Sequence, residues 1–319
     1  MKAAVYRENG GPDVLGYEEV ADPVPGGNEV LISVEAISIE GGDLLMRRMM
    51  PLPHSPHVVG YGTAGTVIAV GEHVTDLRVG QRVSAFGQHG SHAELRAVRA
   101  DHCWVLPDGF DAAAAACVPV AFGTAYEALF ERGAVTAGST VLVQGATGGV
   151  GFAAVQLAAK AGARVIGTGS SHERLDTLRR LGLHDGIDYS TEDVHQRVLE
   201  LTGGTGVDLA LDPVGGPMTQ QVLFATRQGG TVNLVGLSAG PPIIDAITLV
   251  SGNLTVNGFT NSGIFHTPRV RAYVADIIRR IAEGDLEVII DRVFPLADAA
   301  GAHRYAEQRG RIGRVVMVP

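Results

Sequence analysis

Short runs of apolar residues, bounded by Gly, Pro or Asp, dominate the first third of the chain. Examples are EVLISVEAISI, GTAGTVIAV and QRVSAF, which are rich in β-branched residues. Runs of this length between turn residues indicate strands. One helical pattern interrupts them, GGDLLMRRMMP, which begins after two glycines and ends at Pro51. The first part of the chain is therefore predicted to be rich in β-structure.

The hydrophobic pattern changes near residue 120, where predicted strands begin to alternate with helices. The predicted strands are TVLVQG, RVIGTG, GIDY, VDLALDPVG, GTVNLVGL and LTVNGF. Amphipathic segments such as GVGFAAVQLAAKAG and HERLDTLRRLG lie between most of them. This alternation predicts an α/β fold, a doubly wound parallel Rossmann sheet of about six strands with helices on both faces.

After the last of these strands a helical pattern, PRVRAYVADIIRRIAEG, leads to two further short strands, VIIDRVFP and GRVVMVP. We expect this final segment to rejoin the first domain. The predicted organisation is a nucleotide-binding domain at residues 122–261 and a β-rich domain formed by residues 1–121 and 262–319.

Composition excludes several classes of protein. The 319 residues are 45% hydrophobic and have a net charge of -9 without a basic block, so nucleic acid is not an expected partner. The longest apolar run, AAAAACVPVAF, is shorter than a bilayer span, and no membrane partner is expected. Two cysteines, Cys103 and Cys117, are too few for a four-thiolate zinc site or a disulfide framework. A reducing cytoplasm is the expected location.

The segment GATGGVG places Gly145, Gly148 and Gly151 three residues apart between a strand and a helix. Glycine permits the tight turn, and the missing Cβ lets the backbone approach a pyrophosphate. The N–H groups of Gly148, Gly149 and Val150 are the expected donors at the helix N-terminus. A turn without any ligand is the alternative, and the six alternating strands around the motif disfavour it.

The end of the next strand, GTGSS, indicates which dinucleotide is bound. An NAD site usually has an acidic residue about 20 residues after the glycine turn. This chain has no carboxylate there until Glu173, whereas Ser170, Ser171 and Arg174 can donate hydrogen bonds to a 2′-phosphate. The pattern favours NADP(H). The serines also suit the cap of the next helix, and both roles are compatible.

Motifs along the whole chain resemble one family. They are GDLLMRRMMP, GYGTAGTVIAVGEHVTDLRVGQRV, VLPDGFDAAAAACVPVAFGTAYEAL, VLVQGATGGVGFAAVQLA, DPVGG, GGTVNLVGLS and GRIGRVVMVP. In this order they resemble the zinc-independent quinone oxidoreductase branch, which includes zeta-crystallin, of the medium-chain dehydrogenase/reductase superfamily. The resemblance implies that the β-rich part is a GroES-like catalytic domain. Together with the expected edge strand LTVNGF, it also implies a homodimer.

Zinc-dependent relatives hold their metal with a Cys, a His–Glu pair and a further Cys. At the matching places this chain has Glu40, Tyr61 with Gly62, and Val120. One oxygen ligand does not make a tetrahedral zinc site, so no metal is expected. Four histidines in loop-like segments are expected to be scattered over the surface, namely His54, His57, His89 and His92.

The resemblance also implies the residues that contact the cofactor. Those of the glycine turn are Gly145, Thr147, Gly148, Gly149 and Val150. Those around the 2′-phosphate are Ser170, Arg174, Tyr189 and Arg309. Those along the nicotinamide are Thr124, Gly236, Leu237, Phe259 and Thr260.

Hydride transfer to a quinone or an enone builds negative charge on oxygen and needs neither a metal nor a covalent nucleophile. Tyr61 is the candidate proton donor, with a structural aromatic residue and a proton from solvent as the alternatives. Thr124 and Glu40 are the other catalytic candidates. Glu40 stands where many relatives have Asn, and an ionised carboxylate cannot donate to an oxyanion. Asp43 is expected to start the first helix, and Cys117 to be a buried packing residue.

Three functions remain open from the sequence. The first is an NADPH:quinone oxidoreductase, by hydride or one-electron transfer. The second is an NADPH-dependent enone, alkenal or enoyl reductase on the same scaffold. The third is a non-enzymatic NADPH-binding protein with a structural or regulatory role. The substrate in the first two cases is a small molecule.

Overall fold

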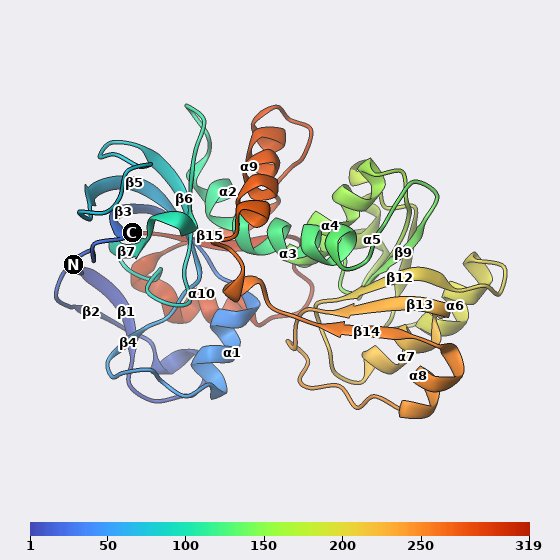
Figure 1. Cartoon of the computed structure of the whole chain (residues 1–319). Helices are drawn as coiled ribbons and strands as arrows, with labels where there is room; N and C mark the ends of the chain where they lie inside the picture. The colour runs from blue at the N-terminus through green and yellow to red at the C-terminus, as the bar shows by residue number, and fades with distance from the viewer. The chain divides into compact units, whose positions relative to one another are not determined.

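The computed structural model describes all residues from 1 to 319 and divides into two compact units (Figure 1). Unit 1 comprises Met1–Gly123, Ser262–Gln308 and Arg314–Pro319, and unit 2 comprises Thr124–Asn261 and Arg309–Gly313. The chain therefore enters unit 2 once through a long central segment and returns to it with five residues near its C-terminus.

Unit 2 contains one six-stranded sheet in the order β11-β10-β9-β12-β13-β14, and every neighbouring pair is parallel. This confirms the predicted Rossmann sheet. The strands are β9 (Thr140–Val143), β10 (Arg164–Gly169), β11 (Asp185–Asp188), β12 (Val207–Asp212), β13 (Thr226–Leu234) and β14 (Thr255–Gly258). The central strands β9 and β12 are buried along almost all of their length, because both faces of the sheet are covered.

Helices lie on both faces of this sheet (Figure 1). They are α4 (Gly149–Lys160), α5 (His172–Asp176), η5 (Arg179–Leu181), α6 (Val194–Leu201), α7 (Met218–Phe224) and α8 (Ala246–Gly252). Side-chain oxygens of Ser171, Asp193 and Asp245 cap three of them. The helices pack on Leu142 and Val232 of the central strands, which are fully buried.

Unit 1 is built around a sheet in the order β15-β16-β3-β5-β6-β8, with β7 also paired to β3, in which every pair is antiparallel except the parallel pair β15-β16. A three-stranded sheet, β2-β1-β4, accompanies it. The strands are β1 (Lys2–Tyr6), β2 (Gly16–Glu19), β3 (Glu29–Ser38), β4 (His57–Val58), β5 (Gly62–Val70), β6 (Arg82–Phe86), β7 (Leu95–Arg99), β8 (Cys103–Val105), β15 (Ile290–Pro295) and β16 (Arg314–Val318). Buried and half-buried residues alternate along most of β3, as period-two patterning predicts. The last strand, β16, pairs with β3 from the first part of the chain.

The helices of unit 1 include one that the sequence patterns did not predict, α10. Apart from η3 (Val118–Phe122), which continues α2, the helices are η1 (Pro12–Val14), α1 (Gly41–Met49), η2 (Ala100–His102), α2 (Ala112–Cys117), η6 (Asn261–Gly263), α9 (Pro268–Ala282), η7 (Leu296–Asp298) and α10 (Ala299–Ala306). The side chain of Asp298 caps α10 by accepting a hydrogen bond from Gly301 N–H at 3.1 Å. A glycine inside a short alanine-rich segment hides this helix from a reading of periodicity.

Helix α2 continues through η3 (Val118–Phe122), α3 (Gly123–Tyr126) and η4 (Glu127–Glu131), where η3 and η4 are π-helical. The continuous run Ala112–Glu131 is 20 residues long and apolar enough, by length and composition, to cross a membrane. It is longer than the run AAAAACVPVAF on which the sequence prediction rested. However, 67% of its most apolar window is buried inside the fold, which is typical of a core helix.

Candidate functional site

The glycine turn after β9 is held tightly against β10. Gly145 has a φ of 62°, and its N–H donates to Thr168 Oγ1 at 3.1 Å. Ala146 N–H donates to the Thr168 carbonyl at 2.8 Å. A Cβ on Gly151 would lie 2.2 Å from the Gly145 carbonyl oxygen, so no side chain fits there. The glycines at these two positions are therefore required by the backbone itself.

Helix α4 presents an open N-terminus beside this turn. Gly148 is its N-cap and supplies no side-chain cap. The N–H group of Gly148 donates to the Gly145 carbonyl at 2.9 Å, inside the turn, so the structure does not leave it free as the sequence analysis expected. Gly149 and Val150 occupy the first two helical positions, where the N–H groups have no intrahelical acceptor. Such an N-terminus fits a pyrophosphate group.

Beyond β10, the structure brings Ser170 and Arg174 together. Arg174 Nη2 donates to the Ser170 carbonyl at 3.0 Å and to Ser170 Oγ at 2.9 Å. Ser171 is the N-cap of α5 and accepts from Arg174 N–H at 3.5 Å. Arg174 Nε is buried without a partner. A buried, unpartnered guanidinium donor next to a hydroxyl fits an anionic ligand with several oxygens, and capping by Ser171 is compatible with that role.

The short segment Arg309–Gly313 lies against both of these features. A Cβ on Gly310 would be 3.3 Å from Arg174 Nη1, and Gly310 itself has a φ of 88°. Gly313 N–H donates to the Thr147 carbonyl of the glycine turn at 2.8 Å. Arg309 therefore directly precedes Gly310, the residue that lies close to Arg174. On the other side, Tyr189 N–H donates to the carbonyl of Gly169, immediately before Ser170, at 3.0 Å.

The loops after β12 and β13 are hydrogen-bonded to each other, and the second of them contains the predicted nicotinamide contacts Gly236 and Leu237. Gly216 N–H donates to the Gly240 carbonyl at 2.8 Å. A Cβ on Gly236 would be 2.1 Å from the Pro213 carbonyl oxygen, so the backbones approach as closely as they can. Asp212 Oδ1 accepts from the N–H groups at 214 and 215, at 2.9 and 2.8 Å. Asp212 is the first residue of the motif DPVGG and shapes this turn. Its role was not predicted from the sequence, although an aspartate before such a turn is a recognisable signal.

Three further residues of the predicted nicotinamide contacts lie in other parts of unit 2. Thr124 is half-buried in α3. Phe259 follows β14, and the guanidinium carbon of Arg132 lies 4.4 Å from the centre of its ring, in cation–π geometry. Thr260 is exposed. Periodicity gave no signal for the Arg132–Phe259 contact, because the two residues are distant in sequence.

In unit 1, Glu40 forms a buried ion pair. It is 2% exposed, and its Oε2 lies 2.6 Å from Arg314 Nη2. Ser38 Oγ donates to Glu40 Oε1 at 2.8 Å and accepts from Arg314 Nη2 at 2.9 Å. Burial raises the pKa of Glu40, and the positive charge of Arg314 opposes the rise. The structure thus gives Glu40 a charge-pairing role at the N-cap of α1, and its catalytic role stays a prediction.

Asp43 and Tyr61 lie at the same end of α1. Asp43 is fully buried; its Oδ2 accepts from Glu40 N–H at 2.8 Å and its Oδ1 has no partner. Burial and the Glu40 charge raise the pKa of Asp43 well above its usual range. Its hydrogen bond from Glu40 N–H places Asp43 at the start of the helix, as predicted. A Cβ on Gly42 would be 2.3 Å from Tyr61 Cε2, so the tyrosine ring lies against this helix.

Burial, together with the charges of Asp43 and Glu40, raises the pKa of Tyr61. The phenol is therefore neutral at physiological pH and keeps its O–H donor. A neutral donor is the form that a proton donor to a developing oxyanion requires.

Of the four histidines expected on the surface, His54 and His89 are exposed, whereas His57 and His92 are not. His57 and His92 are fully buried. The rings of His54 and His89 lie 4.8 and 5.6 Å from that of His57, measured between centroids. The prediction was wrong for His57 because β4 pairs with β1 and takes this residue into the fold. No group of three or more His, Cys, Asp or Glu side chains is arranged to hold a metal ion.

His92 belongs to a buried chain of hydrogen bonds whose direction can be worked out. Arg47 Nη1 lies 2.9 Å from His303 Nδ1 and can only donate. His303 must then carry its proton on Nε2 and donate it to His92 Nε2, 2.8 Å away. His92 in turn donates from Nδ1 to Ser91 Oγ at 3.1 Å. Both imidazoles are neutral in this arrangement, and burial lowers the pKa of His92 to about 3.

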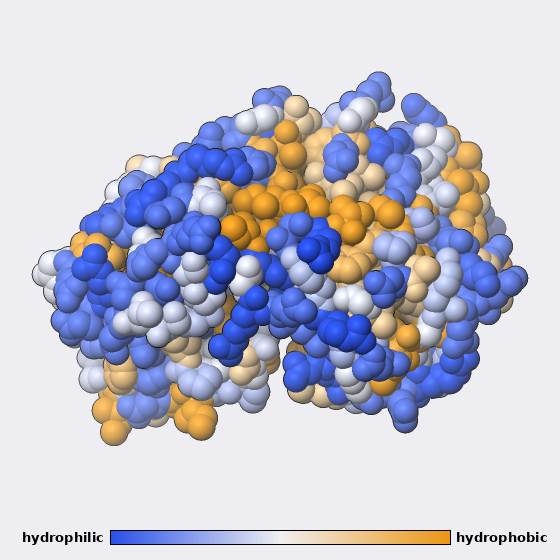
Figure 2. Space-filling model, turned by 180° about the vertical axis from the view of Figure 1, so that it is seen from behind, coloured by the Kyte–Doolittle hydropathy of each residue, from blue (hydrophilic) through white to orange (hydrophobic).

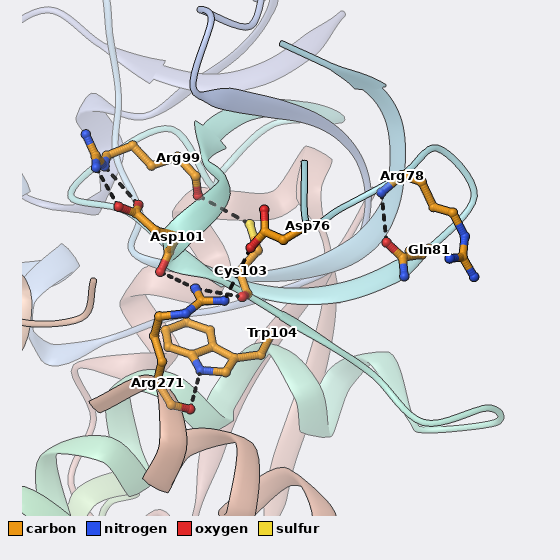
Figure 3. A network of polar contacts seen from close by, with 8 residues as sticks. All are labelled: Asp76, Arg78, Gln81, Arg99, Asp101, Cys103, Trp104 and Arg271. Atoms are coloured by element: carbon orange, nitrogen blue, oxygen red, sulfur yellow. Dashed lines mark hydrogen bonds and ion pairs between the residues drawn. The ribbon is translucent and has the colours of Figure 1, made fainter. Parts of the chain in front are cut away.

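Unit 1 also contains a hollow of about 620 Å³ between β8 and α9. Its polar wall is a closed network (Figure 3). Trp104 Nε1 donates to the Arg271 carbonyl at 3.1 Å, and Arg271 Nη1 donates to the carbonyls of Cys103, at 3.2 Å, and Asp101. Asp76 lies 3.8 Å from Arg271 Nη2. These groups use one another as hydrogen-bond and ion-pair partners.

Comparisons with known proteins agree with these features. Residues 26–121 match the family model for the alcohol dehydrogenase GroES-like domain, and residues 149–283 match that for zinc-binding dehydrogenase. The 2-haloacrylate reductase of a Burkholderia species is 34% identical and covers 100% of this chain and 99% of its own. The quinone oxidoreductase of Pseudomonas aeruginosa is 35% identical, again covering 100% and 99%.

Among solved structures, the Escherichia coli quinone oxidoreductase complexed with NADPH matches with a TM-score of 0.95 and 27% identity, over 100% of both chains. Side chains other than the zinc ligands of the metal-dependent relatives occupy positions 40, 61 and 62. The chain belongs to the zinc-independent quinone oxidoreductase branch of the medium-chain dehydrogenase/reductase superfamily.

Proposed function

We propose that the protein is an NADPH-dependent reductase of quinones that works without a metal ion. The observation that most supports this is the edge of unit 2 after β10, where Ser170 and a partly unpartnered Arg174 occupy the place of an acidic residue. The similarity to quinone oxidoreductases, one of them complexed with NADPH, supports the same cofactor. When bound, NADPH supplies a hydride, so that with one proton a quinone becomes a hydroquinone.

Residues of unit 2 would hold this cofactor. The first-turn N–H groups of Gly149 and Val150 would bind the pyrophosphate, and Ser170, Arg174 and Arg309 the 2′-phosphate. The bonded loops at Gly236 would fix the nicotinamide end. This assignment makes residues 122–261, joined by Arg309–Gly313, the NADP(H)-binding domain, and the rest of residues 1–121 and 262–319 the catalytic domain.

Tyr61 is the side chain proposed to hold the proton for the acceptor oxygen. Its phenol is neutral, because burial and two nearby carboxyl groups raise its pKa. Water is the competing source. Glu40 lacks a role in this step, since Arg314 and Ser38 already engage its carboxylate.

Reduction of an activated alkene is a second candidate function. The similarity to 2-haloacrylate reductase favours it. Both reactions place a hydride on a conjugated carbonyl compound and build negative charge on oxygen, so the same residues suit both.

The test is to mix the purified protein with NADPH or NADH and a panel of quinones and enones, and to follow loss of the reduced cofactor. We expect turnover of a quinone with NADPH preferred. Turnover of enones alone would favour the second function. Binding of NADPH with no turnover across the panel would favour a non-enzymatic protein, and equal use of NADH would contradict the role of Ser170 and Arg174.

We further propose a homodimer in the reducing cytoplasm. Strand β14 ends the sheet of unit 2, and next to it Ile243, Ile247 and Val250 are 90%, 76% and 78% exposed. Seen from behind, hydrophobic atoms protrude at the lower left, where α8 lies (Figure 2). An open strand edge beside exposed apolar residues favours pairing with a second copy. Light scattering at micromolar concentration tests this, with Ile247→Lys expected to give monomers. The two cysteines are free and buried, as suits a reducing compartment.

A further inference from the structure

The strand next to β10 ends in a carboxylate that the sequence analysis did not consider, Asp188. In the parallel pairing of β10 with β11, Asp188 is the partner of Gly169. A Cβ on Gly169 and one on Gly186 would both contact Leu175 of α5. Because side chains alternate along a strand, Asp188 points to the same face as Gly186, the face that α5 covers. The carboxylate therefore lies at the carboxyl end of the parallel strands, opposite the residue that precedes Ser170.

Only one oxygen of Asp188 is engaged within the chain. Oδ1 accepts from Ser190 N–H at 2.9 Å and from Ser190 Oγ at 2.6 Å, whereas no partner occupies Oδ2. Asp188 N–H donates to Glu192 Oε2 at 2.8 Å, and the same oxygen lies 2.9 Å from His172 Nε2. The side chain is thus held in one orientation and keeps an acceptor for a ligand.

The carboxylate is ionised at neutral pH. The hydrogen bonds from Ser190 lower the pKa of Asp188, and the positive charges of His172 and Arg174 lower it further. Arg174 is the residue proposed to bind the 2′-phosphate. Its charge acts on Asp188, so a phosphate held by Arg174 would be within range of the same carboxylate.

We infer that Asp188 limits the preference for NADPH over NADH. This inference rests on the proposed function. A 2′-phosphate has close to two negative charges, which an ionised carboxylate repels. The free 2′-hydroxyl of NADH instead can donate to a carboxylate, the role that an acidic residue at the end of the second strand has in NAD sites. Ser170 and Arg174 favour NADPH, and Asp188 opposes them from the neighbouring strand.

The test is Asp188→Asn, measured as equilibrium dissociation constants for NADPH and NADH by calorimetry, without any acceptor. Asparagine keeps the shape and can still accept both hydrogen bonds from Ser190. We expect the dissociation constant for NADPH to fall about three- to tenfold, and that for NADH to stay unchanged or rise. An unchanged or smaller NADPH preference would overturn the inference.

Asp245→Asn is the matched control. It removes the same charge from unit 2, at the N-cap of α8 beyond the opposite edge of the sheet, and asparagine still caps a helix. Equal shifts in both variants would mean an effect of net charge and would also overturn the inference. A wild-type protein that binds neither nucleotide would refute the proposed function as well. A wild type that prefers NADPH, with no change in Asp188→Asn, would refute only this inference.

Ser190→Ala provides an independent variant. It removes the 2.6 Å hydrogen bond and lets the carboxylate turn toward Arg174. We expect NADPH to bind about two- to fivefold more weakly, the direction opposite to Asp188→Asn. A gain in NADPH affinity would contradict the role of the carboxylate.

Discussion

Polar groups differ in their partners between two regions of the molecule. The first, the nucleotide edge of unit 2, comprises the N-terminus of α4 and the residues after β10; the second is the start of α1 in unit 1. At the nucleotide edge, the first-turn N–H groups of α4 and the Nε of Arg174 have no partner in the chain. At the start of α1, Glu40, Ser38 and Arg314 bind one another within 3 Å. Hydrogen-bond donors without a partner in the chain suit a ligand-binding site, whereas polar groups that already bind one another suit a structural role.

The cluster at the start of α1 occupies the place where the zinc-dependent relatives bind their metal. At the place where related dehydrogenases hold a metal, the chain has a carboxylate whose charge is already balanced by Arg314. A buried ion pair of this kind fixes geometry but binds nothing further.

Breaking the closed cluster has the largest expected effect. Arg314→Met would leave the Glu40 carboxylate buried and unpaired, and we expect the free energy of unfolding to fall by about 3–5 kcal/mol. Urea denaturation, followed through the fluorescence of Trp104, the single tryptophan and a residue of unit 1, measures it. The double variant Glu40→Met, Arg314→Met should recover most of the loss. A single variant as stable as the wild type would show that the pair is not a closed structural unit.

Filling the open site is the next test. In Gly151→Val the Cβ of the new side chain would lie only 2.2 Å from the Gly145 carbonyl oxygen. We expect the turn to distort and the dissociation constant for NADPH to rise at least about 100-fold, or about 2.7 kcal/mol. Gly258→Ala is the control, since nothing lies within 4 Å of its Cβ position. Unchanged binding in Gly151→Val would mean that the turn does not form the pyrophosphate site.

Local sequence patterns were sufficient to predict the backbone features of unit 2. The six strands, the glycine turn and the cap at Ser171 all depend on residues close together in the chain, and all are present in the structure. Only the N–H of Gly148 was assigned wrongly, because its acceptor inside the turn depends on the backbone conformation of Gly145.

The closed clusters could not be predicted in the same way. Glu40 and Arg314 come from opposite ends of the chain and meet only because β16 pairs with β3. His92 and His303 meet through the same kind of long-range packing. Asp188 was overlooked for a related reason: it reaches the nucleotide edge from the strand after the expected one, and strand order is not visible in periodicity.

The histidine chain of unit 1 predicts a pH dependence of stability. The pKa of His92 is lowered to about 3 and that of His303 well below its usual value, so the unfolded chain binds more protons below pH 6.5. Each histidine then removes up to about 1.4 kcal/mol of unfolding free energy per pH unit as the pH falls below 6.5. The raised pKa values of Glu40 and Asp43 act in the opposite direction.

The variant His92→Gln isolates one of these contributions. Its amide oxygen can still accept from His303 Nε2 but does not titrate. Between pH 6.5 and 4.5 we expect its unfolding free energy to fall less steeply than that of the wild type, by about 1.4 kcal/mol per pH unit. Parallel curves from urea denaturation would mean that His92 is not held neutral by the chain.

Tyr61→Phe has the smallest expected effect, because it removes only one O–H group next to the closed cluster. If Tyr61 supplies the proton and water can replace it, kcat falls about tenfold or less, while the dissociation constant for NADPH stays the same. The solvent isotope effect on kcat should change, since a different donor then protonates the acceptor oxygen. Stability should hardly change, because phenylalanine keeps the contact with Phe86, whose ring lies 5.8 Å away. A variant with unchanged kcat and unchanged isotope effect would mean that Tyr61 is a structural residue packed against α1, and would leave the chemistry to the cofactor and water.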